Sequence, residues 1–237
     1  MGDTFRLLGF GPTGWGASLV AGAFMTLAVS LAAYAIGLVL GALGAWGKVA
    51  GRPGVRRAVD VYTTVFRGVP ELLVIYLIYF GGSQALTSLG HLVGQSGFIG
   101  LNGFLAGALA VGVIAGAYLT ETIRGGFLAV PRGEIEAGRA VGMGHALLFR
   151  RVVAPRTLRF ALPTMGNVWQ QVLKDSALIS VTGLGELMRA VNIAGDSTRL
   201  PFDFAIGGMV LYLVLTTLSN GVLRGVERSV AHGERMA

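Results

Sequence analysis

Two long segments of this chain contain no charged side chain. No Asp, Glu, Lys or Arg lies between Arg6 and Lys48, or between Glu71 and Glu121. A soluble globular protein has about 25% charged residues, whereas this chain of 237 residues has 13% charged and 53% hydrophobic residues. A water-facing surface cannot be built from this composition, which excludes an ordinary soluble enzyme and a disordered chain. We therefore predict an all-α, polytopic membrane protein.

Five segments are long and apolar enough to cross a bilayer, which takes about 20 residues in a helix. We predict spans at about residues 17–46, 69–85, 98–120, 160–181 and 204–223, within a single membrane domain of residues 1–237. A polar connection over residues 81–97 is expected between the second and third spans. The chain contains no duplicated half with inverted topology, so a transport pathway would need a second copy or a related partner chain.

Basic residues are distributed unevenly between the two ends of these spans. Fifteen Lys and Arg residues lie between spans one and two, between spans three and four, or after span five, and Arg235 is the last of them. The opposite segments contain three, namely Arg6, Arg189 and Arg199. Because Lys and Arg accumulate in cytoplasmic loops, we expect the N-terminus outside and the C-terminus in the cytoplasm. Basic loops beside a membrane then explain the net charge of +7 better than nucleic-acid binding does.

The loop between spans three and four, residues 130–155, has the pattern of two short helices separated by a turn. Pro131 marks its start and Gly142 marks the turn. On the first helix, Ala137 and Gly138 have little side-chain bulk. A neighbouring protein could therefore approach the backbone closely there.

This loop resembles the EAA loop of importer-type ABC permeases. Glu136, Ala137 and Gly138 are followed after three residues by Gly142 and after nine more by the segment 152–155, which ends at Pro155. Residues 67–73, 117–125 and 173–178 are similar to polar amino acid uptake permeases. Residues 62–64, 161–170 and 216–223 are similar to the Q-type permease of histidine/lysine/arginine/ornithine and opine (octopine or nopaline) systems.

The resemblance implies a bacterial inner membrane permease and a set of partners. These are a homologous second permease subunit, two ATP-binding subunits, a periplasmic or extracellular amino-acid-binding protein, and membrane lipid. ATP and Mg would be bound by the partner ATPase, because this chain has no G-x-x-x-x-G-K-[ST] phosphate loop. The coupling residues implied are Glu136, Ala137, Gly138, Gly142 and Pro155, and substrate would move by alternating access. An ordinary surface pair between Glu136 and Arg139 is the alternative for the glutamate.

Two acidic residues at the edges of spans are candidates for the substrate pathway. Glu71 follows Pro70, so its carboxylate either stabilises the first turn of a helix or attracts a cationic solute. Glu121 lies three residues before Arg124, so the two side chains can also pair with each other.

Polar residues in the fourth span form the second group of pathway candidates. Asn167, Gln170 and Lys174 recur at helical spacing, and Asp175 follows directly. Ionisable groups at membrane depth cost about 2.5 to 3.5 kcal/mol each on insertion scales, so they are expected to face a cavity or a partner. The alternatives are a pathway lining and a hydrogen-bond ladder that joins helices.

No constellation in the sequence predicts catalysis or a metal site. The chain has no cysteine, its three histidines have no partner at ligand spacing, and no serine has a histidine partner. We predict a transport subunit that is not itself an enzyme. Two alternatives remain: a small membrane enzyme or assembly factor whose basic loop binds lipid, and a homo-oligomeric channel.

Overall fold

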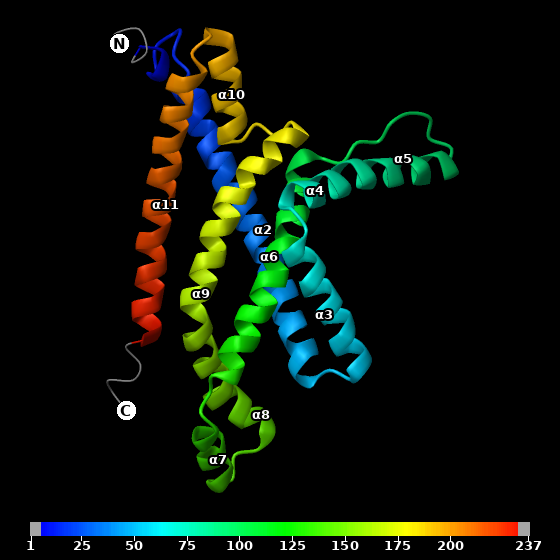
Figure 1. Ribbon diagram of the computed structural model, residues 1–237, viewed down its shortest axis with the longest axis vertical. Coiled ribbons are helices and arrows are strands. Elements are labelled where there is room, and N and C mark those ends of the chain that lie inside the picture. Colours follow the sequence, from blue (N-terminus) through cyan, green and yellow to red (C-terminus); the bar gives the residue numbers. More distant parts are fainter. Residues whose placement is uncertain (1–5, 232–237) are drawn as a thin grey trace.

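The computed structural model describes residues 6–231, and within that range every regular element is helical (Figure 1). The all-α prediction is confirmed. Arg235, which the charge count included, lies outside the described residues. The elements are α2 (Gly16–Ala50), α3 (Pro53–Gly68), α4 (Glu71–Tyr76), a π-helical segment (Leu77–Gly81), α5 (Gly82–Leu92), α6 (Gly103–Leu128), α7 (Arg132–Ala140), α8 (His145–Leu148), a second π-helical segment (Phe149–Val153), α9 (Ala154–Asp175), a 3-10 segment (Ser176–Thr182), α10 (Leu187–Thr198) and α11 (Pro201–Ala231).

Four helical segments of the described chain are long and apolar enough to cross a membrane: Gly16–Ala50, Glu71–Leu92, Gly103–Leu128 and Pro201–Ser229. A fifth is obtained if His145–Thr182 and Leu187–Thr198 are counted as one broken span with a bend of 53°. Figure 1 shows α2, α6, α9 and α11 as the long helices of the bundle, with α7 and α8 at one end and α10 at the other. We call the first of these the α7 end.

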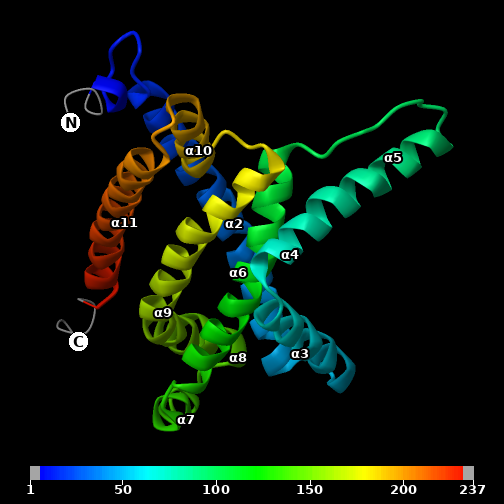
Figure 2. The same cartoon turned by 45° about the horizontal axis from the view of Figure 1, so that its top comes forward.

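The expected polar connection over residues 81–97 is wrong for its first part, because Gly82–Leu92 is the helix α5. Its hydroxyl groups are satisfied locally: Ser83 Oγ donates to the Tyr79 carbonyl at 2.6 Å and accepts from the Leu101 amide at 2.9 Å. Thr87 Oγ1 likewise accepts from the Ile99 amide at 2.9 Å. The hydroxyl groups of α5 therefore hydrogen-bond to the segment that leads back to α6. Helix α5 itself projects from the bundle (Figures 1 and 2).

The predicted third span begins later than expected, at Gly103 rather than near residue 98. Asn102 caps it, because its side-chain oxygen accepts from the Phe104 amide at 2.9 Å. Two further helices were not expected: α3, which follows Pro53 at the α7 end, and α10.

Helices α2 and α6 pack at close range because glycines lie at their contact. A Cβ added at Gly41 would lie 2.6 Å from Leu119 Cβ and 3.1 Å from the Leu119 carbonyl carbon. On α6, a Cβ at Gly116 would lie 2.7 Å from Leu40 Cβ. Small residues spaced four apart allow such approach in membrane helices. Val29, Ala115 and Leu119 are buried in the core beside this contact.

Substitution of Gly41 by valine is expected to destabilise the subunit by about 1 to 3 kcal/mol, because the added methyl groups must displace α6 backbone. Gly54→Val is the matched control, since a Cβ there meets nothing within 4 Å. Thermal unfolding of the purified subunit, followed by fluorescence-detected size exclusion, measures the difference. Equal melting temperatures for the two variants would contradict the packing argument.

A buried glutamate holds α10 against α2 and α11. Glu186 is fully buried and caps α10, where its carboxylate accepts from the Arg189 amide at 2.7 Å and the Met188 amide at 2.9 Å. It also accepts from Tyr212 Oη at 3.1 Å and Thr26 Oγ1 at 3.3 Å. Glu186 could not be predicted from local spacing, since Thr26 and Tyr212 come from helices far apart in the chain.

Candidate functional site

The turn after α7 is set by a left-handed glycine. Gly142 has φ of +80°, which favours glycine because it lacks a Cβ. The Met143 amide donates to the Gly138 carbonyl at 3.1 Å and the Gly142 amide to the Arg139 carbonyl at 2.9 Å. This pair of bonds is the Schellman ending of a helix. The chain is thereby reversed between α7 and α8, as Figure 1 shows at the α7 end.

Gly138 allows α7 and α8 to pack against each other. It is buried, and an added Cβ would lie 2.5 Å from Leu148 Cδ1. An ion pair between Arg156 Nε and Glu134 Oε2, at 2.8 Å, joins the start of α7 to the start of α9. The two short helices and the start of α9 are therefore in direct contact with one another.

The side chain of Glu136 is exposed on α7, as is that of Ala137 beside it. Among residues 6–231, the Glu136 carboxylate has no ion pair, so the surface pair with Arg139 that the spacing allows is not formed. Pro155, also exposed, lies in the first turn of α9. The five predicted coupling residues thus lie within one segment at the α7 end, with Gly138 inside it and the other four at its surface.

The pathway candidates on α9 are only partly available to solvent or a partner. Asn167 and Lys174 are exposed, whereas Gln170 is half-buried and its Nε2 donates to Asn220 Oδ1 on α11 at 2.5 Å. Gln170 therefore joins two helices, which was the alternative for this polar face. Asn167 and Lys174 remain unpaired candidates within the described chain.

Glu71 and Asp175 come from different helices and interact electrostatically. Glu71 is in the first turn of α4, without a side-chain cap, and Asp175 is the last residue of α9. Both are half-buried. The fold thus brings two predicted carboxylates toward each other where α9 ends and the 3-10 segment begins.

Glu121 lies in an ionic network rather than with the other candidates. Arg124 Nε lies 3.0 Å from Glu121 Oε2, which confirms the pair expected from their spacing. The other carboxylate oxygen accepts from Lys48 Nζ. Lys48 Nζ also lies 2.7 Å from Asp60 Oδ1 and donates to Thr63 Oγ1 at 2.8 Å. The network therefore connects α2, α3 and α6 at the α7 end.

From the sequence, Lys48 is one of the basic residues between the first two spans, but in the fold its side chain is only 8% exposed. The signal that could have found it is the placement of Asp60 and Thr63 three residues apart, on one face of the segment after Pro53. Their partner could not be read from spacing, because Lys48 lies on a different helix.

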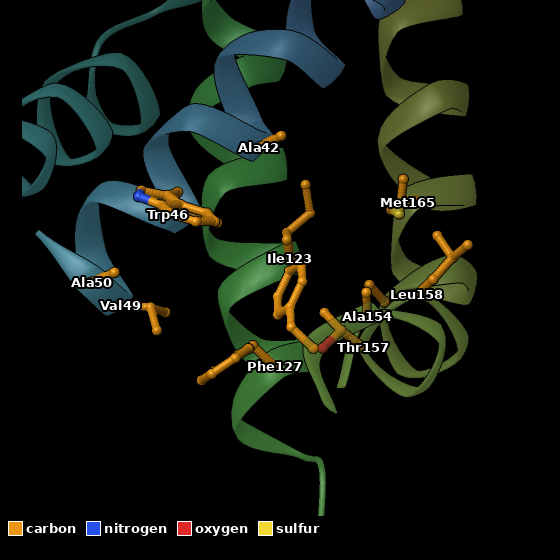
Figure 3. Close-up of a pocket in the computed structure, with 13 residues that line it drawn as sticks. Ala42, Trp46, Val49, Ala50, Ile123, Phe127, Ala154, Thr157, Leu158 and Met165 are labelled. Carbon is orange, nitrogen blue, oxygen red and sulfur yellow. The ribbon is translucent and has the colours of Figure 1, made fainter. Parts of the chain in front are cut away.

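Two cavities lie beside this network. An apolar cavity of about 480 Å³ is enclosed by the ends of α2 and α6 and the start of α9, and Figure 3 shows Trp46, Ile123, Phe127 and Met165 around it. A second cavity of about 510 Å³ is lined by Lys48, Arg56, Asp60 and Arg124 together with apolar residues. Within the described residues, no group of three or more His, Cys, Asp or Glu could hold a metal ion.

Comparison with solved structures places this arrangement among the membrane subunits of ABC transporters. The chain matches a chain of an amino acid ABC transporter crystallised with histidines, with a TM-score of 0.77 and 31% identity, over 91% of this chain and 95% of that chain. It shares the fold of a chain of the inward facing MetNI methionine ABC transporter, with a TM-score of 0.71 and 23% identity, over 90% and 96% of the two chains.

The chain belongs to the family of binding-protein-dependent transport system inner membrane components, whose model matches residues 37–232. It is 51% identical, over 98% of both chains, to the octopine transport system permease protein OccQ of Rhizobium radiobacter. It is 41% identical, over 94% of this chain and 98% of the relative, to the histidine/lysine/arginine/ornithine transport system permease protein HisQ of Escherichia coli strain K12.

This membership confirms the predicted importer-type permease of a bacterial inner membrane. The chain is a transport subunit, and ATP hydrolysis belongs to a separate ATPase. The enzyme and channel alternatives receive no support from these matches.

Proposed function

We propose that this chain is the permease through which an ABC importer moves a cationic amino acid or an opine. The observation that carries the proposal is the full-length similarity to relatives named for octopine, nopaline and the basic amino acids. The proposed partners are a related but distinct permease chain, two ATP-binding subunits that bind ATP and Mg, and a soluble periplasmic or extracellular binding protein.

The proposed orientation has the α7 end in the cytoplasm and the N-terminus outside. The bias of Lys and Arg supports it, since Lys48, Arg56, Arg124 and the arginines of residues 130–155 all lie toward the α7 end. In this orientation α7 faces the compartment that contains ATP. The opposite end, where α10 lies, faces the binding protein.

In the proposed mechanism, α7 and α8 occupy a groove of the ATPase. Closure of the ATPase pair on ATP would move α7, and the Glu134–Arg156 ion pair and the Gly138–Leu148 contact would carry this movement to α9. The permease pair would then change between inward-open and outward-open states as rigid bodies. Exposed Glu136 would make a charge-assisted hydrogen bond or ion pair with the ATPase.

Uptake by the reconstituted transporter tests the proposed function. The chain is purified with its ATPase and partner permease, placed in proteoliposomes with the binding protein, and assayed with labelled arginine, histidine, lysine, octopine and glutamine. We expect ATP-dependent uptake of a cationic amino acid or opine that requires the binding protein. Uptake of glutamine alone would overturn the substrate class, and assembly without an ATPase would overturn the importer.

Substitution of Lys174 by leucine tests the pathway assignment. Lys174 is exposed on α9 in the single subunit, so the variant should assemble normally while uptake changes by about tenfold or more, because the charge that substrate meets is lost. Arg57→Leu, also at an exposed cation, is the matched control. Unaltered uptake, or loss of the assembled complex, would instead favour a packing role for Lys174.

A further inference from the structure

The two cavities at the α7 end adjoin each other and differ in chemistry. Val49 and Phe127 line both of them. The first is lined almost entirely by apolar side chains, so it offers a water molecule few of the two to four polar partners that a buried water needs. It suits a hydrocarbon chain. The second is lined by three cations and one carboxylate, so it suits an anion.

Arg56 is the cation of the second cavity whose charge is not already matched. Lys48 pairs with Asp60 and Glu121, and Arg124 pairs with Glu121. Arg56 is exposed and, within residues 6–231, its guanidinium has no ion pair. An anionic group entering the cavity would therefore meet the unpaired charge of Arg56 beside two cations whose charges Asp60 and Glu121 balance.

The cavities also lie at the end of a membrane-spanning segment, because the residues from Ala42 to Ala50 that line them are the last turns of α2. Trp46 lines the apolar cavity (Figure 3). It is 66% exposed and lies two residues before Lys48 in the sequence. Tryptophan is enriched at membrane interfaces, and basic pockets between helices on the cytoplasmic side bind acidic head groups. A molecule that fills both cavities needs an apolar chain attached to an anion.

We propose that the two cavities form a binding site for an anionic phospholipid of the cytoplasmic leaflet, with one acyl chain in the apolar cavity and the phosphate at Arg56. The inference rests on the orientation in the proposed function. The site touches Phe149 and Ala154, which lie within the coupling loop of residues 130–155, as well as the end of α2. Bound lipid would therefore contact both the start of α9 and the end of α2 and stabilise their relative position.

Photocrosslinking tests the site in the assembled transporter. The complete complex is placed in nanodiscs with phosphatidylglycerol or phosphatidylcholine, each bearing the same diazirine in its acyl chain, and crosslinked peptides are mapped. We expect phosphatidylglycerol to label residues 42–50 and 154–165 about fivefold more than phosphatidylcholine does. Fivefold corresponds to about 1 kcal/mol, the contribution of one basic residue near an anionic membrane surface.

Two variants separate the head-group and chain parts of the site. Arg56→Gln should remove most of the preference for phosphatidylglycerol, while Arg57→Gln, the adjacent exposed arginine outside the cavity, should preserve it. Ala42→Phe fills the apolar cavity without a change of charge and should reduce labelling by both lipids.

Equal labelling by the two lipids, or a preference that survives Arg56→Gln, would overturn the proposal. Absence of labelling in the complete complex would also overturn it, because the second permease would then cover the cavities. ATP-dependent uptake is measured on the same preparations. Uptake without lipid preference defeats this inference alone, whereas lipid preference without uptake defeats the proposed function alone.

Discussion

Replacement of Lys48 by methionine is expected to lower the stability of the subunit by about 3 kcal/mol. Lys48 is the centre of the network between α2, α3 and α6, and its side chain is only 8% exposed. Methionine retains much of the length of the lysine stem but leaves the Glu121 carboxylate with only Arg124. Removal of one partner of a buried pair typically costs about 3 to 5 kcal/mol, since the remaining charge is uncompensated. We take the lower value because Asp60 is half exposed.

Thermal unfolding in detergent measures this effect, and a double variant isolates its cause. Lys48→Met should lower the melting temperature by at least about 5 °C. Lys48→Met combined with Asp60→Asn should recover part of that loss, because Asp60 is the carboxylate that loses its ion pair, whereas Glu121 keeps Arg124. Arg57→Met serves as the control for loss of an exposed cation. A Lys48→Met subunit as stable as this control would show that the network contributes nothing.

Reversal of the charge at Glu136 is expected to uncouple the transporter. Glu136 is exposed on α7 and has no ion pair within the described chain, so Glu136→Lys should not disturb the fold of the subunit. If the carboxylate anchors α7 to the ATPase, the substitution replaces an attraction by a repulsion. Substrate-stimulated ATP hydrolysis should fall at least about tenfold, and the ATPase should no longer co-purify with the permease.

The matched control is Asp196→Lys, an equal change of charge at an exposed residue of α10, at the other end of the bundle. That variant should retain the ATPase in full. Glu136→Gln should have an intermediate effect, because the amide can still accept a hydrogen bond. Normal ATPase binding by Glu136→Lys would remove Glu136 from the docking surface and leave the orientation untested.

Features that depend on local pattern could be predicted from the sequence. The length of an apolar stretch is enough to indicate a spanning helix. For this reason the residue ranges of α2, α6 and α11 overlap the predicted spans. The turn at Gly142 was also predictable, because left-handed backbone favours glycine within a few residues of a helix end. The family resemblance depended on the same short-range spacing around Glu136.

Features that depend on contacts between distant residues could not be predicted in this way. The hydroxyls of the polar stretch after residue 81 accept hydrogen bonds from backbone amides 12 and 18 residues away, and these partners could not be read from the local pattern. Glu186 is buried because it reaches Thr26, which is 160 residues distant. The sequence allowed Gln170 either to line a pathway or to join two helices, and its hydrogen bond to Asn220 on α11 shows that it joins helices.

One physical reason explains why local features could be predicted from the sequence and contacts between distant residues could not. In a membrane chain, apolar length and the signs of the loop charges determine the class of protein and the number of its spans, because each segment meets the bilayer largely by itself. A buried charge is tolerated only where another helix supplies its partner. The positions of Lys48, Glu121 and Glu186 in networks, and the cavities that α2 and α6 form with α9 and with α3, were therefore decided by the packing of helices and not by any one segment of the sequence.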